Sequence, residues 1–317
     1  MSTKVPVTII IVNWNAGAIL QECISHVLKQ SVRPDRIIVV DNASSDGSAD
    51  FMADDDFIDL IKLDSNIGFA AGNNLALRMV ATPYVALLNP DAFPKPKWLE
   101  SLLQSMDEHP KAGSVGSLQL MHGDTKTIDG IGDCYHISGM MWRSRYGRKL
   151  RPVDLQERQI FSPCAAAALY RMDALKNVGF FEESFFCYCE DVDLGFRLRL
   201  SEYESWYKPT AIVEHVGSVT SGGRHSNFAV YHGHRNLMWV YFRNLPMLLL
   251  VLFMPLHLCI TVLSFIKFIV RGQTRTIFKA KCDGFRALPS VLKQRKSILQ
   301  KRKISLIKLL SILSYKK

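Results

Sequence analysis

Over the first 90 residues, short apolar runs alternate with polar turns and with segments of helical periodicity. The first run, VTIIIV at residues 7–12, is followed by a turn-like Asn-Trp-Asn-Ala-Gly segment and by a helical pattern over residues 19–30. Further strands are predicted at residues 36–40, 57–63 and 84–88. Strands that are apolar at every position are buried on both faces of a sheet, and parallel strands need crossover helices. The pattern therefore predicts an α/β fold with a Rossmann-like, mainly parallel, doubly wound sheet.

Polar residues gather where these predicted strands end. Asp41, residues 66–74 and residues 89–91 each follow a predicted strand. The carboxyl ends of the strands form the ligand-binding edge of a doubly wound sheet, so we expect a binding site there. No Gly-x-Gly-x-x-Gly joins a strand to a helix and no P-loop motif is present, which argues against nicotinamide dinucleotides and P-loop nucleotides as ligands.

The pattern is less regular in the second half of the chain. Residues 123–159 are polar, aromatic and basic, and they form either a substrate-facing excursion or a mobile loop. Regular structure is predicted again from residue 162, with a small-residue run at 164–169, a short helix ending at Val178 and a helix that begins near Glu190. Acids in the first turn favour this last helix because they complement the helix dipole.

The charge of the chain is concentrated near its C-terminus. The 317 residues include 39 Lys and Arg against 29 Asp and Glu, a formal net charge of +10. Residues 271–317 hold fourteen Lys and Arg and one acid, Asp283, so they contribute 14 − 1 = +13 and the rest of the chain carries 10 − 13 = −3. A nearly neutral body argues against nucleic acid as its ligand, and the basic tail has few aromatic residues for base stacking. We therefore predict no nucleic-acid partner and an anionic membrane surface as the partner of the tail.

A long apolar segment precedes the basic tail. Residues 245–270 are long enough to cross a bilayer, which takes about 20 apolar residues. A single span would place the basic tail opposite a cytosolic catalytic domain, against the positive-inside bias, so an interfacial or re-entrant segment is the better interpretation. Residues 304–313 also have the pattern of an amphipathic surface helix. The alternative is a helical hairpin packed on the body of the protein.

The cysteines and the N-terminus bear on the compartment. Seven cysteines without a C-x-x-C pair or regular spacing argue against a disulfide framework and favour a reducing cytosol. The N-terminus runs into a strand-like stretch without the basic and apolar regions of a signal peptide, so we expect the catalytic part to stay in the cytosol.

Six short segments combine glycine, amide and carboxylate residues: VNWN at 12–15, VDNASSDGS at 40–48, NIGFAAGNN at 66–74, LLNPDA at 87–92, FFCYCEDVDLGFRL at 185–198 and EHVGS at 214–218. In this order they resemble the family 2 glycosyltransferases of the GT-A fold, and in particular the bacterial rhamnosyltransferases of O-antigen and cell-wall assembly. The resemblance covers roughly residues 5–240. It implies a catalytic domain at residues 1–243, with a nucleotide-binding half at about 1–112 and an acceptor and catalytic half at about 113–243. A helical membrane-associating region at residues 244–317 follows.

The resemblance implies that a sugar nucleotide binds at the strand ends. Asp41 would read the nucleotide base; an Asx-turn or helix cap is the structural alternative, which Asp46 could serve equally well. The structural alternatives to a donor contact are helix capping for Asn66 and packing for Gly72. For Arg235 the alternative is a position on a helix surface without contact to a ligand. The further donor contacts implied by the resemblance come from Asn13, Asn15, Asn66, Gly68, Asn73, Asn74, Asn89 and Arg235.

Residues 89–91 read Asn-Pro-Asp and occupy the place of the family's Asp-x-Asp metal motif, with Asn replacing the first aspartate. By resemblance, Asp91 binds Mg²⁺ or Mn²⁺ and His215 assists it, since one carboxylate can suffice when diphosphate oxygens complete the metal shell. An ordinary turn acid and a hydrogen-bonded core histidine are the alternatives. A zinc site built on His225, His232 and His234 lacks cysteine or carboxylate partners at matching spacing.

Glu190 and Asp191 match the family's catalytic acidic pair, in which the second acid is the general base. Such a base must face the anomeric carbon from the side opposite the diphosphate, so that attack is in line and inverts the configuration. The resemblance therefore implies that Asp191 deprotonates the acceptor hydroxyl. Stabilisation of a helix N-terminus is the alternative, and it suits Asp193 well.

The implied function is inverting, metal-dependent sugar transfer at the cytoplasmic face of the bacterial inner membrane. By resemblance the donor is dTDP-L-rhamnose and the acceptor is a polyprenyl-diphosphate-linked glycan of O-antigen or cell-surface polysaccharide synthesis. A UDP donor of galactose or N-acetylglucosamine is the alternative within the same class. A catalytically silent membrane scaffold is the alternative outside it, although a scaffold has no reason to keep acids at every strand end.

Overall fold

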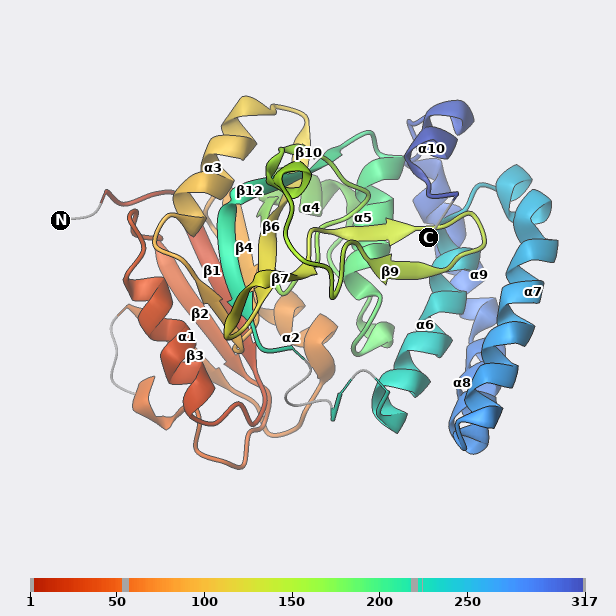
Figure 1. The fold of residues 1–317 in the computed structure, drawn as a ribbon, viewed down its shortest axis with the longest axis horizontal. Helices are drawn as coiled ribbons and strands as arrows, with labels where there is room; N and C mark the ends of the chain where they lie inside the picture. The colour runs from red at the N-terminus through yellow and green to blue at the C-terminus, as the bar shows by residue number, and fades with distance from the viewer. Residues whose placement is uncertain (1–2, 53–56, 218–221, 224, 316–317) are drawn as a thin grey trace.

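The computed structural model describes residues 3–52, 57–217, 222–223 and 225–315, and a ten-stranded β-sheet forms its centre (Figure 1). One half of this sheet is parallel, in the strand order β3-β2-β1-β4. Its strands are β1 (Val7–Asn13), β2 (Arg36–Asp41), β3 (Ile58–Lys62) and β4 (Tyr84–Leu88). These are the four strands that the apolar runs predict, and the parallel arrangement is confirmed for this half.

The other half of the sheet mixes parallel and antiparallel pairs. β11 (Ala167–Arg171) runs antiparallel to β4 and to β6 (Ala112–Met121), and β12 (Glu204–His215) runs parallel to β6. Three short strands pair with β12 or β6: β5 (Ala92–Pro94), β7 (Asp124–Gly130) and β10 (Arg158–Gln159). The regular strand and helix alternation ends before this half, so its pairing does not follow from the sequence pattern.

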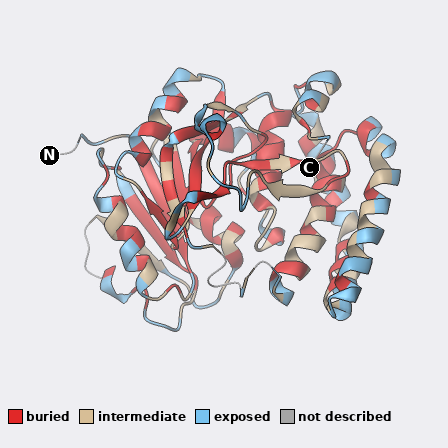
Figure 2. Ribbon diagram, viewed as in Figure 1, coloured by how far each residue is buried: buried red, intermediate tan, exposed pale blue. Residues whose placement is uncertain are grey.

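Helices cover both faces of the parallel half, as a doubly wound sheet requires. Ile9 of β1 packs in one layer with α1 (Ala18–Leu28) and α3 (Trp98–Glu108), whereas Ile10 packs in the layer on the other face. The second layer contains α2 (Gly68–Leu77), α4 (Met172–Val178) and α5 (Glu190–Leu200). Successive strand residues point to opposite faces, so a strand covered on both faces is apolar throughout. Figure 2 shows these strands buried and the outer surfaces of the helices exposed.

Residues 123–159, for which the pattern predicts no element, fold as an ordered excursion from the sheet. β7 is followed by β8 (Asp133–Tyr135), β9 (Met141–Arg143), the short 3-10 helix η2 (Pro152–Leu155) and β10. β8 and β9 form an antiparallel hairpin. The backbone carbonyl of Tyr135 accepts a hydrogen bond from Ser314 N–H at 2.8 Å, and the carbonyl of Ser138 accepts one from the His257 ring at 2.8 Å. The hairpin is therefore fixed against the C-terminal part of the chain.

Helices of the C-terminal part pack together beside the sheet (Figure 1). They are α6 (Asn227–Asn244), α7 (Met247–Val270), α8 (Thr274–Arg286), α9 (Leu288–Gln300) and α10 (Leu306–Ile312). Arg295 of α9 donates a hydrogen bond to the carbonyl of Phe242 in α6 at 2.8 Å. Leu245 and Val291 are buried in one cluster with Phe196 of α5. The hydrophobic core thus continues across the predicted boundary between residues 243 and 244.

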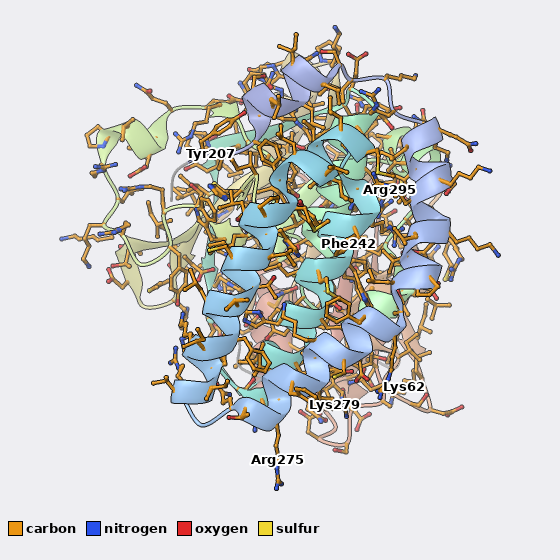
Figure 3. The ribbon with its side chains drawn as sticks, turned by 90° about the vertical axis from the view of Figure 1, so that its right-hand side faces the viewer. Lys62, Tyr207, Phe242, Arg275, Lys279 and Arg295 are labelled. Carbon is orange, nitrogen blue, oxygen red and sulfur yellow. The ribbon has the colours of Figure 1, made fainter. Side chains whose placement is uncertain are left out.

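One helix in the described part of the chain, α7, is long and apolar enough to cross a membrane by length and composition. It has 24 residues with a mean hydropathy of 2.4 in its most apolar window, and 17% of that window is buried. Its exposed side is apolar and includes Leu248, Val251, Leu252, Val262, Leu263 and Ile266. Figure 3 shows the outer side of these helices, with Arg275 at the start of α8 pointing away from the body.

The segment predicted as an amphipathic surface helix packs on the protein instead. Ile304, Leu309 and Leu313 are buried in the same core cluster as α6, whereas Ile307 is 82% exposed. The same apolar spacing serves a helix on a membrane and a helix on a protein surface, and here the body supplies the apolar partner.

Candidate active site

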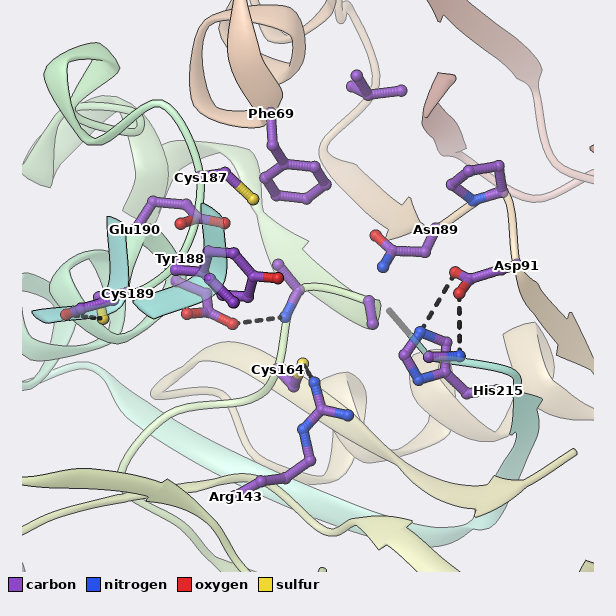
Figure 4. Close-up of a pocket in the computed structure, with 18 of the residues that line it drawn as sticks. Phe69, Asn89, Asp91, Arg143, Cys164, Cys187, Tyr188, Cys189, Glu190 and His215 are labelled. Atoms are coloured by element: carbon purple, nitrogen blue, oxygen red, sulfur yellow. Dashed lines mark hydrogen bonds and ion pairs between the residues drawn. The ribbon is translucent and has the colours of Figure 1, made fainter. Parts of the chain in front are cut away.

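A cavity of about 1020 Å³ opens at the carboxyl ends of β1 and β4 (Figure 4). Residues that follow these strands line it together with the start of α5, the segment 215–217 after β12 and the hairpin residue Arg143. The cavity lies at the edge of the sheet where the sequence predicts a ligand site. Its volume suits a ligand of the size of a sugar nucleotide.

Asp91 and His215 form one side of the cavity. Asp91 follows β4 and His215 ends β12, and the antiparallel pairing of His215 with Ala92 brings the two side chains together. The Nε2 atom of His215 lies 3.3 Å from Oδ1 of Asp91, and the Gly217 N–H donates to Oδ2 at 3.0 Å. The structure thus joins two residues that the sequence predicts for one metal site.

Asp129 of β7 holds the other nitrogen of the His215 ring. Its Oδ2 atom lies 2.8 Å from Nδ1, and the same carboxylate pairs with Arg143. Burial alone would lower the pKa of His215, but the hydrogen bonds to Asp129 and Asp91 outweigh it and raise the pKa to about 9. Burial alone would raise the pKa of Asp91, but the hydrogen bond and charge of His215 hold it below its usual value. Both shifts have the same cause, which is the pairing of the His215 ring with the neighbouring carboxylates.

The atoms on this side of the cavity fit a divalent cation. Within the described chain, Oδ1 of Asn89 is buried and forms no hydrogen bond, and Nε2 of His215 has only its ion pair with Asp91. Buried polar atoms normally have partners, so such atoms beside a carboxylate point to a ligand. Carboxylate and amide oxygens with an imidazole nitrogen suit Mg²⁺ or Mn²⁺. Metal binding by Asp91 and His215 stays a prediction.

The loop before α5 has an unusual backbone. Phe186, Tyr188 and Cys189 have φ angles of 64°, 70° and 68°, which non-glycine residues rarely adopt. Asn236 of α6 holds this loop, since its Nδ2 atom lies 2.8–2.9 Å from the backbone carbonyl oxygens of Phe185, Cys187 and Tyr188. A strained segment that is fixed by a buried amide is typical of functional sites.

Glu190 and Asp191 begin α5 and line the cavity, and Figure 4 shows Glu190 on the side opposite Asp91 and His215. Oδ1 of Asp191 accepts a hydrogen bond from the N–H of Val192 at 2.8 Å, and Oδ2 accepts one from the Ala165 N–H at 3.2 Å. Burial raises the pKa of both carboxyl groups, and the nearby charge of Asp191 raises that of Glu190 further. A raised pKa brings a carboxylate closer to the range in which it can accept a proton at neutral pH.

Arg143 connects the two sides of the cavity. Besides its ion pair with Asp129, its guanidinium donates to Sγ of Cys164 at 2.9 Å. Cys164 precedes Ala165, whose N–H holds Asp191. A continuous series of contacts therefore runs from the His215 side to the Asp191 side.

Three potential metal ligands lie near Arg143. One ligand atom each of Asp133, Cys164 and Asp191 lies within 4.8 Å of the other two. The Arg143 guanidinium already contacts Cys164, and burial raises the pKa of this thiol, so the thiolate that a metal requires is disfavoured. We therefore describe this cluster as a group of polar side chains that line the cavity, and not as a second metal site.

Three residues predicted to bind the donor, Asn13, Asn15 and Asp41, belong to a hydrogen-bonded cluster next to the cavity. Nδ2 of Asn13 lies 2.8 Å from Oδ1 of Asp41, and the Ser44 hydroxyl donates to the same oxygen at 2.5 Å. Oδ1 of Asn15 accepts a hydrogen bond from the Ser45 N–H at 2.8 Å. The structure brings Asn13, Asn15 and Asp41 together, but the cavity is lined by their neighbours Val12, Trp14, Ala16 and Asn42. Base recognition by Asp41 stays a prediction.

Asp46 has the turn-forming role that was the alternative for Asp41. Its carboxylate accepts hydrogen bonds from the N–H groups of Gly17 at 2.8 Å and Ser48 at 3.0 Å. These contacts account for Asp46 without a ligand.

The start of α2 contributes to the cavity, but its later residues do not. Asn66 and Gly68 line the cavity, and Oδ1 of Asn66 accepts a hydrogen bond from the Gly68 N–H at 2.9 Å. Gly68 has a φ of 88°, and a Cβ atom there would lie 2.6 Å from the Phe186 ring, so only glycine fits. Asn73 and Asn74 are buried, donate to backbone carbonyl groups and lie outside the cavity lining. A donor contact by either stays a prediction.

Arg235 also lies outside the cavity lining. Its guanidinium donates to the carbonyl groups of Ser184 at 3.1 Å and Phe185 at 2.9 Å, and it lies 4.3 Å from the ring centre of Trp239. These contacts fix the segment before α5, and a diphosphate contact by Arg235 stays a prediction.

Comparison with known proteins identifies the family. Glycosyl transferase family 2 matches residues 8–179, more than half of the chain. The chain belongs to this family. An N-acetylglucosaminyl-diphospho-decaprenol L-rhamnosyltransferase of Mycobacterium tuberculosis is 24% identical over 247 residues, which cover 71% of this chain and 80% of that protein. A poly-beta-1,6-N-acetyl-D-glucosamine synthase of Staphylococcus epidermidis is 24% identical over 214 residues, which cover 66% and 50%.

Solved glycosyltransferase structures share the fold. GalNAc-T7 with UDP, GalNAc and Mn²⁺ has a TM-score of 0.59 and 12% identity, over 75% of this chain and 47% of that chain. The mannosyltransferase PcManGT of Pyrobaculum calidifontis, with GDP-Man and Mn²⁺, has a TM-score of 0.53 and 16% identity, over 96% and 78%. These similarities confirm the predicted GT-A fold of this family 2 glycosyltransferase.

Sequence reasoning missed several residues of the glycosyltransferase cavity. Trp14 and Tyr188 lie inside resembling segments and line the cavity, so their position next to predicted residues was an available signal. Asp129 and Arg143 lie in the irregular stretch 123–159, where no periodicity indicates which side chains share a face.

Proposed function

We propose that this glycosyltransferase transfers L-rhamnose from dTDP-L-rhamnose to a polyprenyl-diphosphate-linked glycan in O-antigen or cell-surface polysaccharide synthesis, with inversion at the anomeric carbon. The Mycobacterium tuberculosis relative supports this substrate pair, because its name states L-rhamnosyl transfer to an N-acetylglucosaminyl-diphospho-decaprenol. One observation carries the catalytic assignment. Asp91, His215, Glu190 and Asp191 line one cavity, and Glu190 lies across it from Asp91 and His215 (Figure 4).

The cation side of the cavity would hold the donor diphosphate. Asp91, His215 and Asn89 would bind Mg²⁺ or Mn²⁺, and both neighbours described above were solved with Mn²⁺. A bound divalent cation neutralises the charge of a leaving diphosphate. The Gly217 N–H and the His215 ring keep the Asp91 carboxylate in one orientation toward this site.

The acidic pair would supply the base. Asp191 takes the proton of the acceptor hydroxyl, whose oxygen forms a bond to the anomeric carbon while the bond from that carbon to the diphosphate oxygen breaks. Attack from the side opposite the diphosphate inverts the configuration. The two backbone N–H groups that bind the Asp191 carboxylate keep it oriented, and Glu190 lies beside it as the second acid of the pair.

Apart from Arg235, the other predicted donor contacts lie in the N-terminal half of a catalytic domain that we place at residues 1–243. Asn66 and Gly68 would approach the ribose and diphosphate directly, since both line the cavity. Asp41, Asn13 and Asn15 would act near the nucleotide base from the cluster beside the cavity. Asn73, Asn74 and Arg235 would reach the donor only after a change of side-chain position, because their present contacts are to backbone carbonyl groups.

The membrane partner would bind through α7, at the cytoplasmic face of the bacterial inner membrane. The exposed side of α7 is apolar, whereas His257 on its inner side is buried and bonds to the hairpin carbonyl of Ser138. A helix with one face on the protein and an apolar face outside suits an interfacial position. The Lys and Arg residues of 271–317 would add attraction to anionic lipid, on the order of 1 kcal/mol for each charge near the surface.

A transfer assay with a donor panel tests the proposal. The purified full chain would be given a polyprenyl-diphospho-N-acetylglucosamine acceptor and dTDP-L-rhamnose, UDP-galactose or UDP-N-acetylglucosamine, with Mn²⁺, Mg²⁺ or EDTA. We expect product from dTDP-L-rhamnose in the presence of metal and none in EDTA. Full activity in EDTA would contradict the metal assignment.

A UDP donor is the second candidate, and the poly-beta-1,6-N-acetyl-D-glucosamine synthase relative favours it. Transfer from UDP-N-acetylglucosamine or UDP-galactose alone would select it over rhamnose transfer. A folded protein that transfers no sugar from any donor to any lipid-linked acceptor would instead support a silent scaffold.

A further inference from the structure

A compact basic turn follows the hairpin that carries Arg143. Its sequence, RYGRKLR at residues 145–151, contains four cations and no acid. A separate cleft of about 440 Å³ is lined by four residues, Arg145, Arg148, Lys149 and Arg151. Neither the metal side nor the acidic side of the active site uses these residues.

The turn is held rigidly by its backbone. The Arg148 N–H donates to the carbonyl of Arg145 at 3.0 Å, and Gly147 allows the reversal with a φ of 69°. Gly147 N–H and the carbonyl of Arg148 both bond to the backbone of Ile128 in β7, each at 2.9 Å. The four cationic side chains therefore start from fixed positions, which lowers the entropic cost of binding an anion.

The charge of the cleft is only partly neutralised. The buried Asp154 pairs with Arg145 at 2.8 Å and also lies 3.8 Å from Arg151, and Asp124 pairs with Lys149 at 2.9 Å. Arg148 is exposed and forms no side-chain hydrogen bond or ion pair with a described residue. Four cations against these two acids leave two positive charges available to a ligand.

The cleft lies next to the active-site cavity. Tyr146, between two residues that line the cleft, lines the large cavity itself. A ligand that enters the cavity with its reacting hydroxyl could therefore place an attached anionic group in the cleft.

We propose that this cleft binds the diphosphate of the lipid-linked acceptor. The inference rests on the proposed function, in which a second diphosphate besides that of the donor must be accommodated near the cavity. Arginine guanidinium groups bind phosphate oxygens in a bidentate manner, so an arginine-rich cleft suits this group better than an uncharged glycan. A phospholipid headgroup carries the same phosphate chemistry and is the competing source.

The variant Arg148→Ala/Arg151→Ala tests the proposal, because both side chains are exposed and their removal leaves the core intact. In uncharged detergent micelles, we expect the KM for the polyprenyl-diphosphate-linked acceptor to rise by at least about tenfold, the scale of losing charged hydrogen bonds, with the donor KM unchanged. The matched control Lys29→Ala/Lys97→Ala removes two exposed cations, one just after α1 and one just before α3, and should change neither constant.

Direct binding keeps the test independent of turnover. With the donor site saturated by dTDP and Mn²⁺, farnesyl diphosphate should bind the wild type at least about tenfold more tightly than the Arg148→Ala/Arg151→Ala variant. This result would stand even if no sugar transfer were found. Unchanged acceptor KM and unchanged farnesyl diphosphate binding would overturn the proposal. Loss of binding to phosphatidylglycerol vesicles alone, with both other measurements unchanged, would overturn it in favour of a phospholipid headgroup.

Discussion

The Nδ1 atom of His215 lies 2.8 Å from Oδ2 of Asp129, so a buried carboxylate sets the orientation of the ring that faces Asp91. Asp129 also pairs with Arg143, and it lies on the far side of the His215 ring from Asp91. It acts through His215, in the way that outer carboxylates orient histidines at metal sites.

Replacement of Asp129 should therefore weaken metal binding. We expect Asp129→Asn to lower the affinity for Mn²⁺ by about 10- to 100-fold, the usual effect of losing such a partner, and to raise the donor KM in parallel. Titration of Mn²⁺ by electron paramagnetic resonance measures the affinity directly. Asp107→Asn, an exposed acid on α3, is the matched control. An affinity within twofold of wild type would show that Asp129 does not orient the ring.

Glu190 should reduce the stability of the protein at neutral pH. Burial raises its pKa above the ordinary value of 4.5, so the folded state holds the proton more tightly than the unfolded state. The protonated Glu190 carboxyl group therefore stabilises the fold fully at pH values below its pKa in the unfolded state. This stabilisation is lost as the pH rises through its pKa in the folded state. Glu190→Gln removes the ionisation, so we expect a higher Tm than wild type at pH 8 and a smaller decline in Tm from pH 5 to pH 8. Glu22→Gln, at an exposed position of α1, should leave both unchanged; a lower Tm for Glu190→Gln at pH 8 would contradict the assignment.

Asp193, two positions after Asp191, should be structural. It is fully buried, pairs with Arg197 at 2.8 Å and lies 3.4 Å from Arg243, and Asn244 donates to it at 2.7 Å. Removing one partner of a buried ion pair leaves an uncompensated charge. We expect Asp193→Ala to lower the free energy of unfolding by about 3–5 kcal/mol in urea denaturation. Asp173→Ala, on the exposed first turn of α4, should cost far less, and an equal effect of both would refute the role of the network.

Much of the fold follows from the sequence, and the reason is physical. The apolar runs that become β1, β2 and β4 are buried on both faces, so a shifted register or an exposed position would leave apolar side chains in water. The mixed half of the sheet depends on long-range pairing, such as that of β12 with β6, for which the sequence carries no local signal.

The residues of the site also fall into two groups, those with a local sequence signal and those placed by long-range contacts. Asp91 and Asp191 lie within recognisable segments and line the predicted cavity. Arg143 reaches it only because the hairpin of β8 and β9 is fixed between the sheet and α7, a contact between residues far apart in the chain. The pattern of residues 304–313 predicts an apolar face correctly but not its partner, since the buried side of Leu309 meets protein rather than lipid.

The exposed apolar face of α7 should control membrane binding. Leu252→Lys/Val262→Lys places two charges on this face without touching its buried side. Losing the burial of two apolar side chains, at about 1.5–3 kcal/mol each, should weaken sedimentation with phosphatidylglycerol vesicles by at least about tenfold. Leu28→Lys, at an exposed position of α1, should have no effect. Undiminished sedimentation of the α7 variant would place the membrane contact elsewhere.

Asp191 is the proposed general base, and its replacement by asparagine tests the proposed mechanism most directly. We predict that Asp191→Asn lowers kcat by at least about 100-fold, the usual scale for a general base, while the donor Kd from calorimetry in the presence of Mn²⁺ stays within about threefold of wild type. The matched control Asp173→Asn changes an exposed acid on α4 and should retain the activity. A kcat of Asp191→Asn within a few-fold of wild type would contradict the proposed mechanism.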